Sequence, residues 1–388
     1  MRGEGSRAWW LYGPACAGKS ATAWEIYAHL LRGQPRAYFD VDQVGMCYPE
    51  PAGDPGRYAL KARAAGELVG RLAQAGARTV VVSGVLEAAS FPTVVARAGG
   101  VPVTFCRLRT EAGVLRERLE RRYDPQTVRH VLGEVEGRDD GGLHPVVDSS
   151  DDGPRRVARQ VVAAMEAATP SPPTVSAPPP STPPAAPSAP AALSAPPSAG
   201  RAVLVCGPTG VGTSTLGFAL AVRRWAAGSG CAYLDLQQIG FLRGLPSDAA
   251  RARELRASCV AGLWEHYRGV GADELVLGGH VRTPGELEEH RAALGGTPLL
   301  VVRLRASRER LRERITARSR GRGPANLAGD TMRGLSATQV DAVVHRSLAQ
   351  QERLERCGLA DVVLDTDDVD PGQGAEELQA LWDHHLAP

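Results

Sequence analysis

A glycine-rich segment near the N-terminus has the residue types and spacing of a phosphate-binding loop. It fits the pattern Gly-x-x-x-x-Gly-Lys-Ser/Thr between an apolar run and a helical pattern, and reads Gly13-Pro14-Ala15-Cys16-Ala17-Gly18-Lys19-Ser20-Ala21. Glycine lets the backbone aim successive N–H groups at phosphate oxygens, and a helix start adds partial positive charge. We therefore expect these residues to bind ATP, with Lys19 as a catalytic cation on the β- and γ-phosphates and Ser20 as a Mg²⁺ ligand.

Two carboxylates follow the second apolar run, in the sequence Asp40-Val41-Asp42. Residues two apart in a strand point to the same face, and ligands of parallel sheets bind at the carboxyl ends of the strands. We expect Asp40 to contribute to the Mg²⁺ site. We also expect Asp40 and Asp42 to act in catalysis, by orienting metal-bound water or accepting the proton of a substrate hydroxyl. The alternative is that the pair caps a turn.

A cationic pair lies further along, at Arg57 and Lys61 of a helical segment that begins with proline. Positions four apart share one helix face, so we expect this pair to hold an anionic or polar substrate. An ordinary solvated helix face is the alternative. The chain has only two lysines, Lys19 and Lys61, which favours a functional interpretation. Gly84, after the third apolar run, is a further candidate substrate contact.

The fourth apolar run leads into an arginine-rich helix. The planar guanidinium suits phosphate oxygens, and we expect arginines of residues 116–122 to clamp the triphosphate. The catalytic candidates are Arg118, Arg121 and Arg122. Glu117 and Glu120 also lie in this helix, so the alternative is a salt-bridged surface helix.

The chain contains an internal repeat. Cys206-Gly207-Pro208-Thr209-Gly210-Val211-Gly212-Thr213-Ser214 matches the first loop, and further landmarks follow in the same order at nearly constant spacing. The residues of this loop expected to contact nucleotide are Gly207, Gly210, Gly212, Thr213 and Ser214. Thr213 replaces the loop lysine, Gln237 replaces the second acid and Leu255 replaces the second cation, so we expect the second half to be degenerate. A glycine-rich insertion at residues 321–330, with a shorter equivalent near 133–142, is expected to act as a lid.

Short apolar runs alternate with helical patterns throughout each half. This predicts an α/β fold in which each half is a five-stranded parallel sheet with helices on both faces. The runs of the first half are Trp9–Tyr12, Ala37–Val41, Thr79–Val82, Val103–Leu108 and Pro145–Val147. The expected domains are residues 1–166 and 201–388. Between them, residues 167–200 are uncharged and rich in proline, which predicts an extended linker that would allow the flanking halves to move independently.

Composition narrows the classes of partner. The net charge of +2 gives no basic field for nucleic acid or membranes, and no apolar run is long enough to span a bilayer. Seven scattered cysteines without CxxC spacing favour reduced thiols over disulfides or a zinc site. We therefore expect a cytoplasmic protein whose partners are nucleotide and a small molecule, with contact between the halves left open.

In these motifs each half resembles the small P-loop kinases typified by shikimate, gluconate and nucleoside monophosphate kinases, and is most similar to uncharacterised ATP-binding proteins of that superfamily. The resemblance implies tandem P-loop NTPase domains, Mg-ATP as phosphoryl donor and arginines supplied by a lid. Ser83 and Gly278 stand where motor and transport ATPases carry an acid, which disfavours those classes. The first half also lacks the three consecutive glycines of shikimate kinases, which disfavours shikimate as its substrate.

The sequence thus predicts a small-molecule kinase whose N-terminal half transfers the γ-phosphoryl group of ATP. Two alternatives stay open. One is a nucleotide-sensing protein without transfer, and the other is a slow NTPase without an acceptor.

Overall fold

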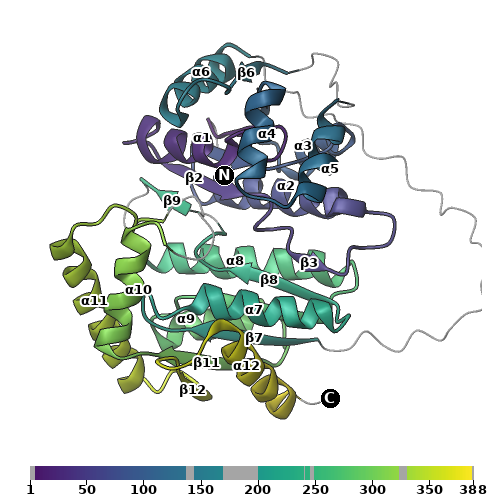
Figure 1. Ribbon diagram of the computed structural model, residues 1–388. Coiled ribbons are helices and arrows are strands. Elements are labelled where there is room, and N and C mark those ends of the chain that lie inside the picture. Colours follow the sequence, from purple (N-terminus) through teal and green to yellow (C-terminus); the bar gives the residue numbers. More distant parts are fainter. Residues whose placement is uncertain are drawn as a thin grey trace, which may run out of the picture.

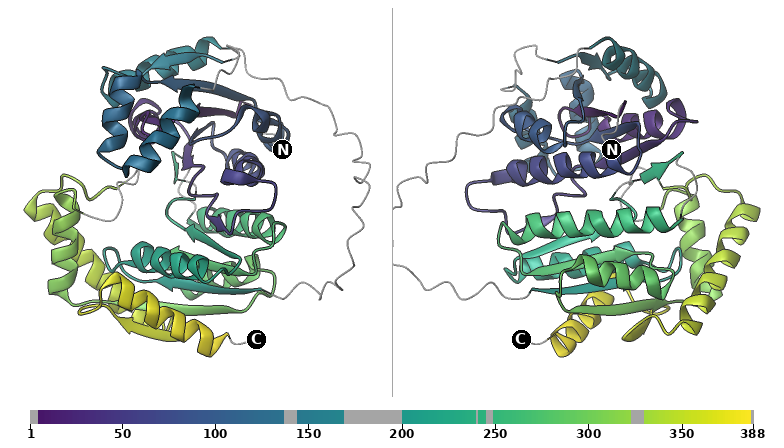
Figure 2. Two further views of the ribbon diagram at one scale, coloured as in Figure 1. Left: turned by 45° about the vertical axis from the view of Figure 1, so that its right-hand side comes forward. Right: turned by 180° about the vertical axis from the view of Figure 1, so that it is seen from behind.

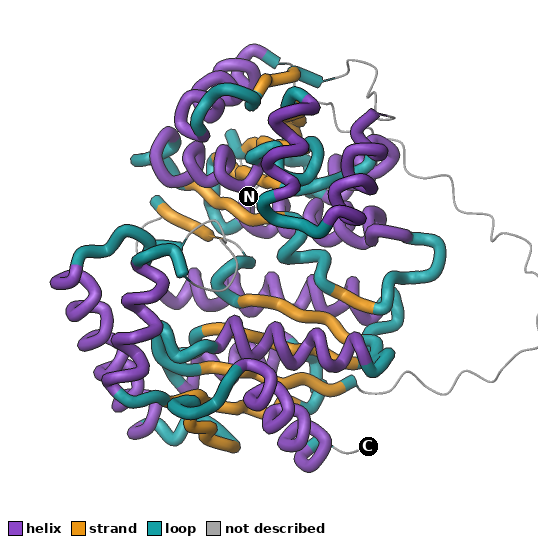
Figure 3. The backbone as a smooth tube through the Cα atoms, in the orientation of Figure 1, coloured by secondary structure: helices purple, strands orange, loops and turns teal. Residues whose placement is uncertain are grey.

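Two six-stranded sheets form the framework of the protein, one built mainly by each half of the chain (Figures 1 and 3). The computed structural model describes residues 5–136, 144–168, 200–239, 241–244, 249–322 and 330–386. The strand orders are β6-β5-β1-β4-β2-β9 and β12-β11-β7-β10-β8-β3. The strands are β1 Arg7–Tyr12, β2 Arg36–Asp40, β3 Cys47–Tyr48, β4 Thr79–Ser83, β5 Val103–Arg109, β6 Val146–Asp148, β7 Arg201–Cys206, β8 Cys231–Asp235, β9 Phe241–Arg243, β10 Glu274–Gly279, β11 Leu299–Arg305 and β12 Val362–Asp365.

Helices connect the parallel strands, as right-handed βαβ crossovers require. In the first half they are α1 Lys19–Glu25, the π-helical turn η1 Ile26–Leu30, the 3₁₀ turn η2 Pro55–Arg57, α2 Tyr58–Gln74, the 3₁₀ turn η3 Ala88–Ser90, α3 Phe91–Arg97, α4 Ala112–Glu120, α5 Pro125–Glu136 and α6 Pro154–Ala167. In the second half they are α7 Thr213–Ala226, α8 Ala249–Arg268, α9 Pro284–Ala293, α10 Arg308–Ser319, α11 Ala337–Arg356 and α12 Pro371–His385.

Alternate residues of the central strands feed two apolar layers. Trp10 of β1 belongs to a buried cluster with residues of α2 and α3, such as Leu68. Its neighbour Trp9 belongs to a separate buried cluster with residues of α1 and α6, such as Val161. Because side chains alternate across a strand, this division places helices on both faces of the sheet, as predicted.

The five strands predicted for the first half are confirmed within two residues at each end. They pair in parallel with one another. The helical pattern after the first loop forms α1, which continues directly into the π-helical turn η1.

The predicted count of five strands per sheet is wrong by one. Each sheet gains a short antiparallel strand from the other half: β3 pairs with β8, and β9 pairs with β2. An open sheet edge leaves N–H and C=O groups unpaired, and this reciprocal exchange covers the edge of each parallel sheet. Figure 1 shows β9 beside the first half and β3 beside the second.

One apolar cluster continues through both halves. It includes Leu60 and Leu68 of α2 together with Val260 and Leu263 of α8, and these two helices lie side by side (Figure 2). The contact between the halves, which the sequence left open, is therefore an apolar core shared by both. Most of the predicted linker, residues 169–199, lies outside the described residues.

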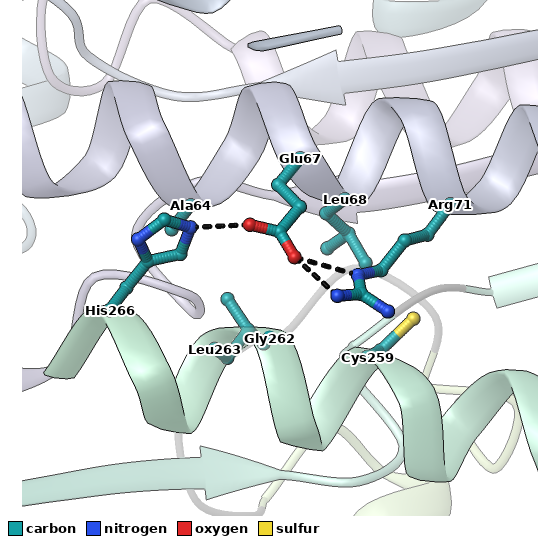
Figure 4. A pocket seen from close by; sticks show the side chains of 8 residues that line it. All are labelled: Ala64, Glu67, Leu68, Arg71, Cys259, Gly262, Leu263 and His266. Atoms are coloured by element: carbon teal, nitrogen blue, oxygen red, sulfur yellow. Dashed lines mark hydrogen bonds and ion pairs between the residues drawn. The ribbon is translucent and has the colours of Figure 1, made fainter. Parts of the chain in front are cut away.

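A polar network crosses the contact between α2 and α8 (Figure 4). Oε2 of Glu67 lies 2.7 Å from Nε2 of His266 in the other half, and Oε1 accepts a hydrogen bond from Nε of Arg71 at 2.8 Å. Gly262 makes this close approach possible, since a Cβ there would lie 2.8 Å from Nη2 of Arg71. The contact therefore joins a carboxylate of one half to a small residue and a histidine of the other.

Within the part of the chain that the structure describes, no helix is both long and apolar enough to cross a bilayer. Residues 323–329 of the lid expected at 321–330 lie outside the described residues. Residues 137–142 of its shorter equivalent near 133–142 also lie outside them.

Candidate active site

The first glycine-rich loop joins β1 to α1, as its sequence predicts. Gly13 and Gly18 have φ values of 140° and 86°, in the region that favours glycine. Cys16 also has a positive φ, 61°, which is costly for a residue with a Cβ and indicates that the loop conformation is imposed by its surroundings. No side chain caps the start of α1, so its first N–H groups point into the loop without a side-chain acceptor.

Lys19 is buried in this loop, with 7% of its surface exposed. Its Nζ donates to the carbonyl oxygen of Pro14 at 2.7 Å. Burial lowers the pKa of Lys19, while the negative charges of Asp42 and Asp40 oppose that shift. The ammonium is therefore held within the loop, near both acids predicted to work with it.

Asp40 is tied directly to the start of α1. Its Oδ2 accepts hydrogen bonds from Ser20 Oγ at 2.6 Å and from Ser83 Oγ at 2.7 Å, and its Oδ1 accepts one from Asp42 N at 3.0 Å. Burial raises the pKa of Asp40, and the charge of Asp42 raises it further, whereas the two serine hydroxyls lower it. The predicted metal ligands Ser20 and Asp40 thus lie in direct contact.

These two groups suit Mg²⁺, which prefers oxygen ligands and is usually held by one or two carboxylates together with substrate phosphates. Among the described residues there is no group of three or more His, Cys, Asp and Glu side chains arranged to bind a metal ion. Mg²⁺ at this place would therefore be held by Ser20, Asp40, the nucleotide and water, rather than by a protein cage.

Asp42 forms an ion pair with the second lysine. Nζ of Lys61 lies 2.8 Å from Oδ1 of Asp42, and the Asp42 side chain remains 53% exposed. Burial acts to raise the pKa of Asp42, but the charges of Lys61, Lys19 and Arg57 outweigh it and lower that pKa. Asp42 is consequently an ionised, accessible carboxylate between two lysines.

Arg57 lies near this pair but not on the helix predicted for it. Helix α2 begins at Tyr58, and Arg57 precedes it with a φ of 59°. Its guanidinium stacks 3.8 Å from the centre of the Tyr48 ring, and Nη1 lies 3.7 Å from Glu50. Among the described residues, its Nε and Nη1 have no hydrogen-bond partner. The expected shared helix face is therefore wrong, although both cations act on Asp42.

The predicted clamp arginines take three different positions. Arg118 donates to the backbone oxygens of Ser149 and Ser150, at 2.7 and 2.9 Å. Arg121 pairs with Glu117 at 3.4 Å on the exposed surface. Arg122 is the one whose charge acts on Lys19, lowering the pKa of that lysine. Arg118 therefore fixes a turn and Arg121 belongs to the surface alternative, while Arg122 lies exposed just beyond α4 and acts on the loop through its charge.

Gly84 has a packing function in this structure. Its N–H donates to the carbonyl oxygen of Leu11 at 3.2 Å, and a Cβ there would strike the side chain of Val41. The N–H of Gly84 is thus already hydrogen-bonded within the protein and is not available for the substrate contact predicted for this residue.

Ser83 and Tyr38 are site residues that were not predicted as such. Ser83 was noted only because it stands where motor and transport ATPases carry an acid. The hydroxyl of Ser83 bonds Asp40, and the Tyr38 hydroxyl lies 3.0 Å from that of Ser83. The sequence did contain one signal for Ser83: it ends the third predicted strand. In the parallel sheet this strand lies beside the strand that ends in Asp40. The register of Ser83 with Asp40 follows from the pairing of β2 with β4.

The second loop keeps the backbone of the first but is partly filled by its own chain. Gly210 and Gly212 have φ values of 86° and 111°. The N–H of Thr209 donates to Oε1 of Gln350 at 3.3 Å, and Nδ1 of His280 lies 2.8 Å from the carbonyl oxygen of Gly207. Side chains of the second half therefore occupy a donor and an acceptor of this loop.

The acid of the second half is retained. Ser214 hydrogen-bonds the Asp235 carboxylate, and burial raises the pKa of Asp235. Thr213, at the position of Lys19, is buried and brings no charge.

The counterpart of Lys61 is Arg256, not Leu255. The alignment of α2 with α8 is fixed by an equivalent hydrogen bond at the end of each helix. Ala77 N donates to Leu72 O in the first half, and Ala272 N donates to Tyr267 O in the second. Counting back the same number of residues from Leu72 and from Tyr267 aligns Lys61 with Arg256. Nη1 of Arg256 lies 2.8 Å from Oε1 of the buried Glu286. The second half thus retains a cation there, but it is neutralised within the protein.

No protein-family model matches the chain, and no curated protein matches it. Among solved structures, a tunicamycin resistance protein from Deinococcus radiodurans is 23% identical, with a TM-score of 0.33, over 43% of this chain and 99% of its own. A gluconokinase from Sinorhizobium meliloti is 23% identical, with a TM-score of 0.33, over 42% and 93%. An APS kinase from Mycobacterium tuberculosis, in complex with AMPPNP and APS, is 16% identical, with a TM-score of 0.30, over 47% and 98%. Their activities are properties of those proteins.

Proposed function

We propose that the protein is a phosphotransferase whose N-terminal half transfers the γ-phosphoryl group of ATP to a small hydroxyl-bearing acceptor. The observation that carries this proposal is one continuous chain of contacts. Ser20 bonds Asp40, Asp40 bonds the backbone of Asp42, and Asp42 pairs with Lys61. This chain runs from the phosphate-binding loop to a second cationic position. In this proposal, residues 1–166 and 201–388 are two kinase-like domains.

The loop holds the triphosphate in this proposal. Its backbone N–H groups and the Lys19 ammonium would replace water around the phosphate oxygens and stabilise the charge that develops during transfer. Mg²⁺ held by Ser20 and Asp40 would neutralise phosphate charge. Arg122 would approach the same oxygens from the end of α4, since its charge already acts on Lys19.

Asp42 is the group that would accept the proton of the acceptor hydroxyl. It is ionised because its pKa is lowered, and about half of its side chain is accessible. In the transfer step the acceptor oxygen forms a bond to the γ-phosphorus, the bond between that phosphorus and the β,γ-bridging oxygen of ATP breaks, and the hydroxyl proton passes to Asp42. Lys61 would hold Asp42 in position for this step.

The acceptor itself would carry a negative charge beside its hydroxyl. Arg57 supports this, because its buried Nε and Nη1 lack hydrogen-bond partners among the described residues. Nη1 meets Glu50 at 3.7 Å, beyond hydrogen-bond distance, so an anionic substrate group would supply the hydrogen bonds that these two nitrogens lack.

A panel assay tests the proposal. ADP release from Mg-ATP would be measured with hydroxylated carboxylates, hydroxylated phosphates and neutral polyols. We expect release to depend on an anionic acceptor and to require both Lys19 and Asp42. Equal ADP release with and without every acceptor would leave only an NTPase.

A second candidate is a nucleotide sensor without transfer. It is favoured by the shared core, which would let occupancy of one half affect the other. Tight ATP binding in calorimetry, with no ADP formed with any acceptor, would support the sensor instead of the kinase.

A further inference from the structure

The segment that carries Asp42 leaves the N-terminal half and joins the second sheet. After Asp42 the chain runs through Val44 and Gly45 to β3, which pairs with β8. The N–H of Tyr233, in β8, donates to the carbonyl oxygen of Met46 at 2.8 Å. The acid of one half is therefore attached by a short turn to a strand of the other.

Lys61 depends on this same turn. Its side chain lies so close to Gly45 that a Cβ there would come within 2.6 Å of Lys61 Cγ. Lys61 therefore packs against the backbone of this turn on its way to Asp42. A shift of the turn would displace both Asp42 and the surface against which its lysine partner lies.

A tyrosine of the second half fixes the path. Oη of Tyr267, on α8, donates to the carbonyl oxygen of Val44 at 2.7 Å, and both residues are fully buried. Burial raises the pKa of Tyr267 well above its usual value, so the hydroxyl keeps the proton that it donates. A buried hydroxyl is costly unless it is hydrogen-bonded, and this bond satisfies it.

The contact is not a by-product of the repeat. Leu72 is the residue of α2 equivalent to Tyr267, because Ala77 N bonds Leu72 O as Ala272 N bonds Tyr267 O. Leucine has no hydroxyl, so the first half offers no reciprocal bond to the second. The tyrosine occurs only in the half whose own loop has lost its lysine.

We infer that the C-terminal half positions the acceptor side of the N-terminal site, and that Tyr267 is the positioning residue through its bond to Val44. This inference rests on the proposed function, which assigns Asp42 and Lys61 to the acceptor side of the site. The second half is then required even if it binds no nucleotide, because it holds the turn at which Asp42 and Lys61 meet.

The two lysines provide a direct readout that needs no known acceptor. The full chain, made with lysine isotope-labelled at its ε-carbon, should give two NMR signals, one from Lys19 and one from Lys61. The variant Lys61→Arg would identify them by removing one. We expect Tyr267→Phe, which keeps the ring and its volume, to move or split the Lys61 signal and to move the Lys19 signal much less, because Asp42 contacts Lys61 directly but acts on Lys19 through its charge. Affinity for Mg-ATP should stay within about twofold, as for distant sites.

Tyr233→Phe is the matched control. It removes a buried hydroxyl of the same half, one that donates to the backbone oxygen of Ser214 at 3.2 Å rather than to the first half. Its Lys61 signal should match the wild type. A general loss of stability would move both lysine signals or neither, so the difference between them separates positioning from folding.

An unchanged Lys61 signal in Tyr267→Phe would overturn the inference. The proposed function fails separately, if the wild-type Lys19 signal does not respond to Mg-ATP. In that case the Lys61 comparison still decides whether Tyr267 holds the turn.

Discussion

Nζ of Lys61 lies 2.8 Å from Oδ1 of Asp42, although one comes from α2 and the other from the turn after β2. Gly45 leaves room for the lysine chain, and the second half holds the turn through Tyr267. The acceptor side of the site is therefore a product of both halves, whereas the phosphate-binding loop belongs to the first half alone.

Replacing Lys19 by alanine should abolish most phosphoryl transfer. The ammonium is buried in the loop and would act on charge that develops in the transition state. Loss of one such preorganised group costs about 10² to 10³ in rate. Rates of ADP formation at saturating ATP, with an anionic acceptor present, would measure the loss.

Thr213→Ala is the control for that variant, because Thr213 has the same place in the second loop and no charge. Its rate should equal that of the wild type. If Lys19→Ala retained wild-type turnover, or if Thr213→Ala lost it, the N-terminal loop would not be the site of transfer.

Asp40→Asn should make the fold more stable at neutral pH while weakening Mg-dependent nucleotide binding. Burial and the charge of Asp42 raise the pKa of Asp40, so the folded state disfavours its ionised form. The resulting penalty is absent below the unfolded-state pKa and grows as pH rises through the folded-state pKa. We expect the free energy of unfolding to rise by about 1 kcal/mol at pH 7, the size usual for a single stabilising substitution. This gain should shrink as the pH is lowered.

Urea titrations of both proteins at several pH values would measure this gain. Asp368→Asn, whose side chain is fully exposed in the second half, controls for the removal of a charge. A variant that is less stable than the wild type at pH 7 would show that the hydrogen bonds from Ser20 and Ser83 outweigh the burial of the charge.

The sequence predicts the first loop well because its signals are local. The glycines, Lys19 and Ser20 lie in one short stretch, and their backbone conformation follows from that stretch. The acid Asp40 is equally predictable, since it ends a buried strand. The partner of that acid, Ser83, lies on another strand and becomes visible only when the pairing of β2 with β4 is known.

The exchange of strands has no comparable signal. β3 spans two residues and β9 three, and the strand with which each pairs lies in the other half. Neither segment has a length or an alternation that separates it from a loop. For the same reason the shared core is invisible in the sequence, where α2 and α8 are simply two amphipathic helices and Gly262 gives no indication that Glu67 packs over it.

Glu67→Gln should destabilise the protein at neutral pH. Burial acts to raise the pKa of Glu67, but the hydrogen bonds and charges of Arg71 and His266 outweigh it and lower that pKa. A carboxylate with a lowered pKa stabilises the fold above its unfolded-state pKa, and that contribution is lost as pH falls through the folded-state value. Because the side chain is 27% exposed, we expect a modest loss of about 1 kcal/mol at pH 7.

Thermal unfolding at neutral and acidic pH would check this expectation. The difference between Glu67→Gln and wild type should narrow as the pH falls. Glu265→Gln, at an exposed position of α8, should have little effect at either pH. A Glu67→Gln protein as stable as the wild type at pH 7 would mean that the network across the two helices contributes nothing.

Cutting the chain between the halves should leave them together. A protease site introduced at residues 180–190 would divide the polypeptide, but β3 would remain paired with β8 and β9 with β2. Separation would expose sheet edges and divide the apolar cluster that Leu68 and Leu263 share, so association is favoured by burial as well as by hydrogen bonding. We expect the cut protein to elute in gel filtration at the size of the intact chain and to keep its affinity for Mg-ATP. Two separate peaks after cutting would contradict both the exchanged strands and the dependence of the first half on Tyr267.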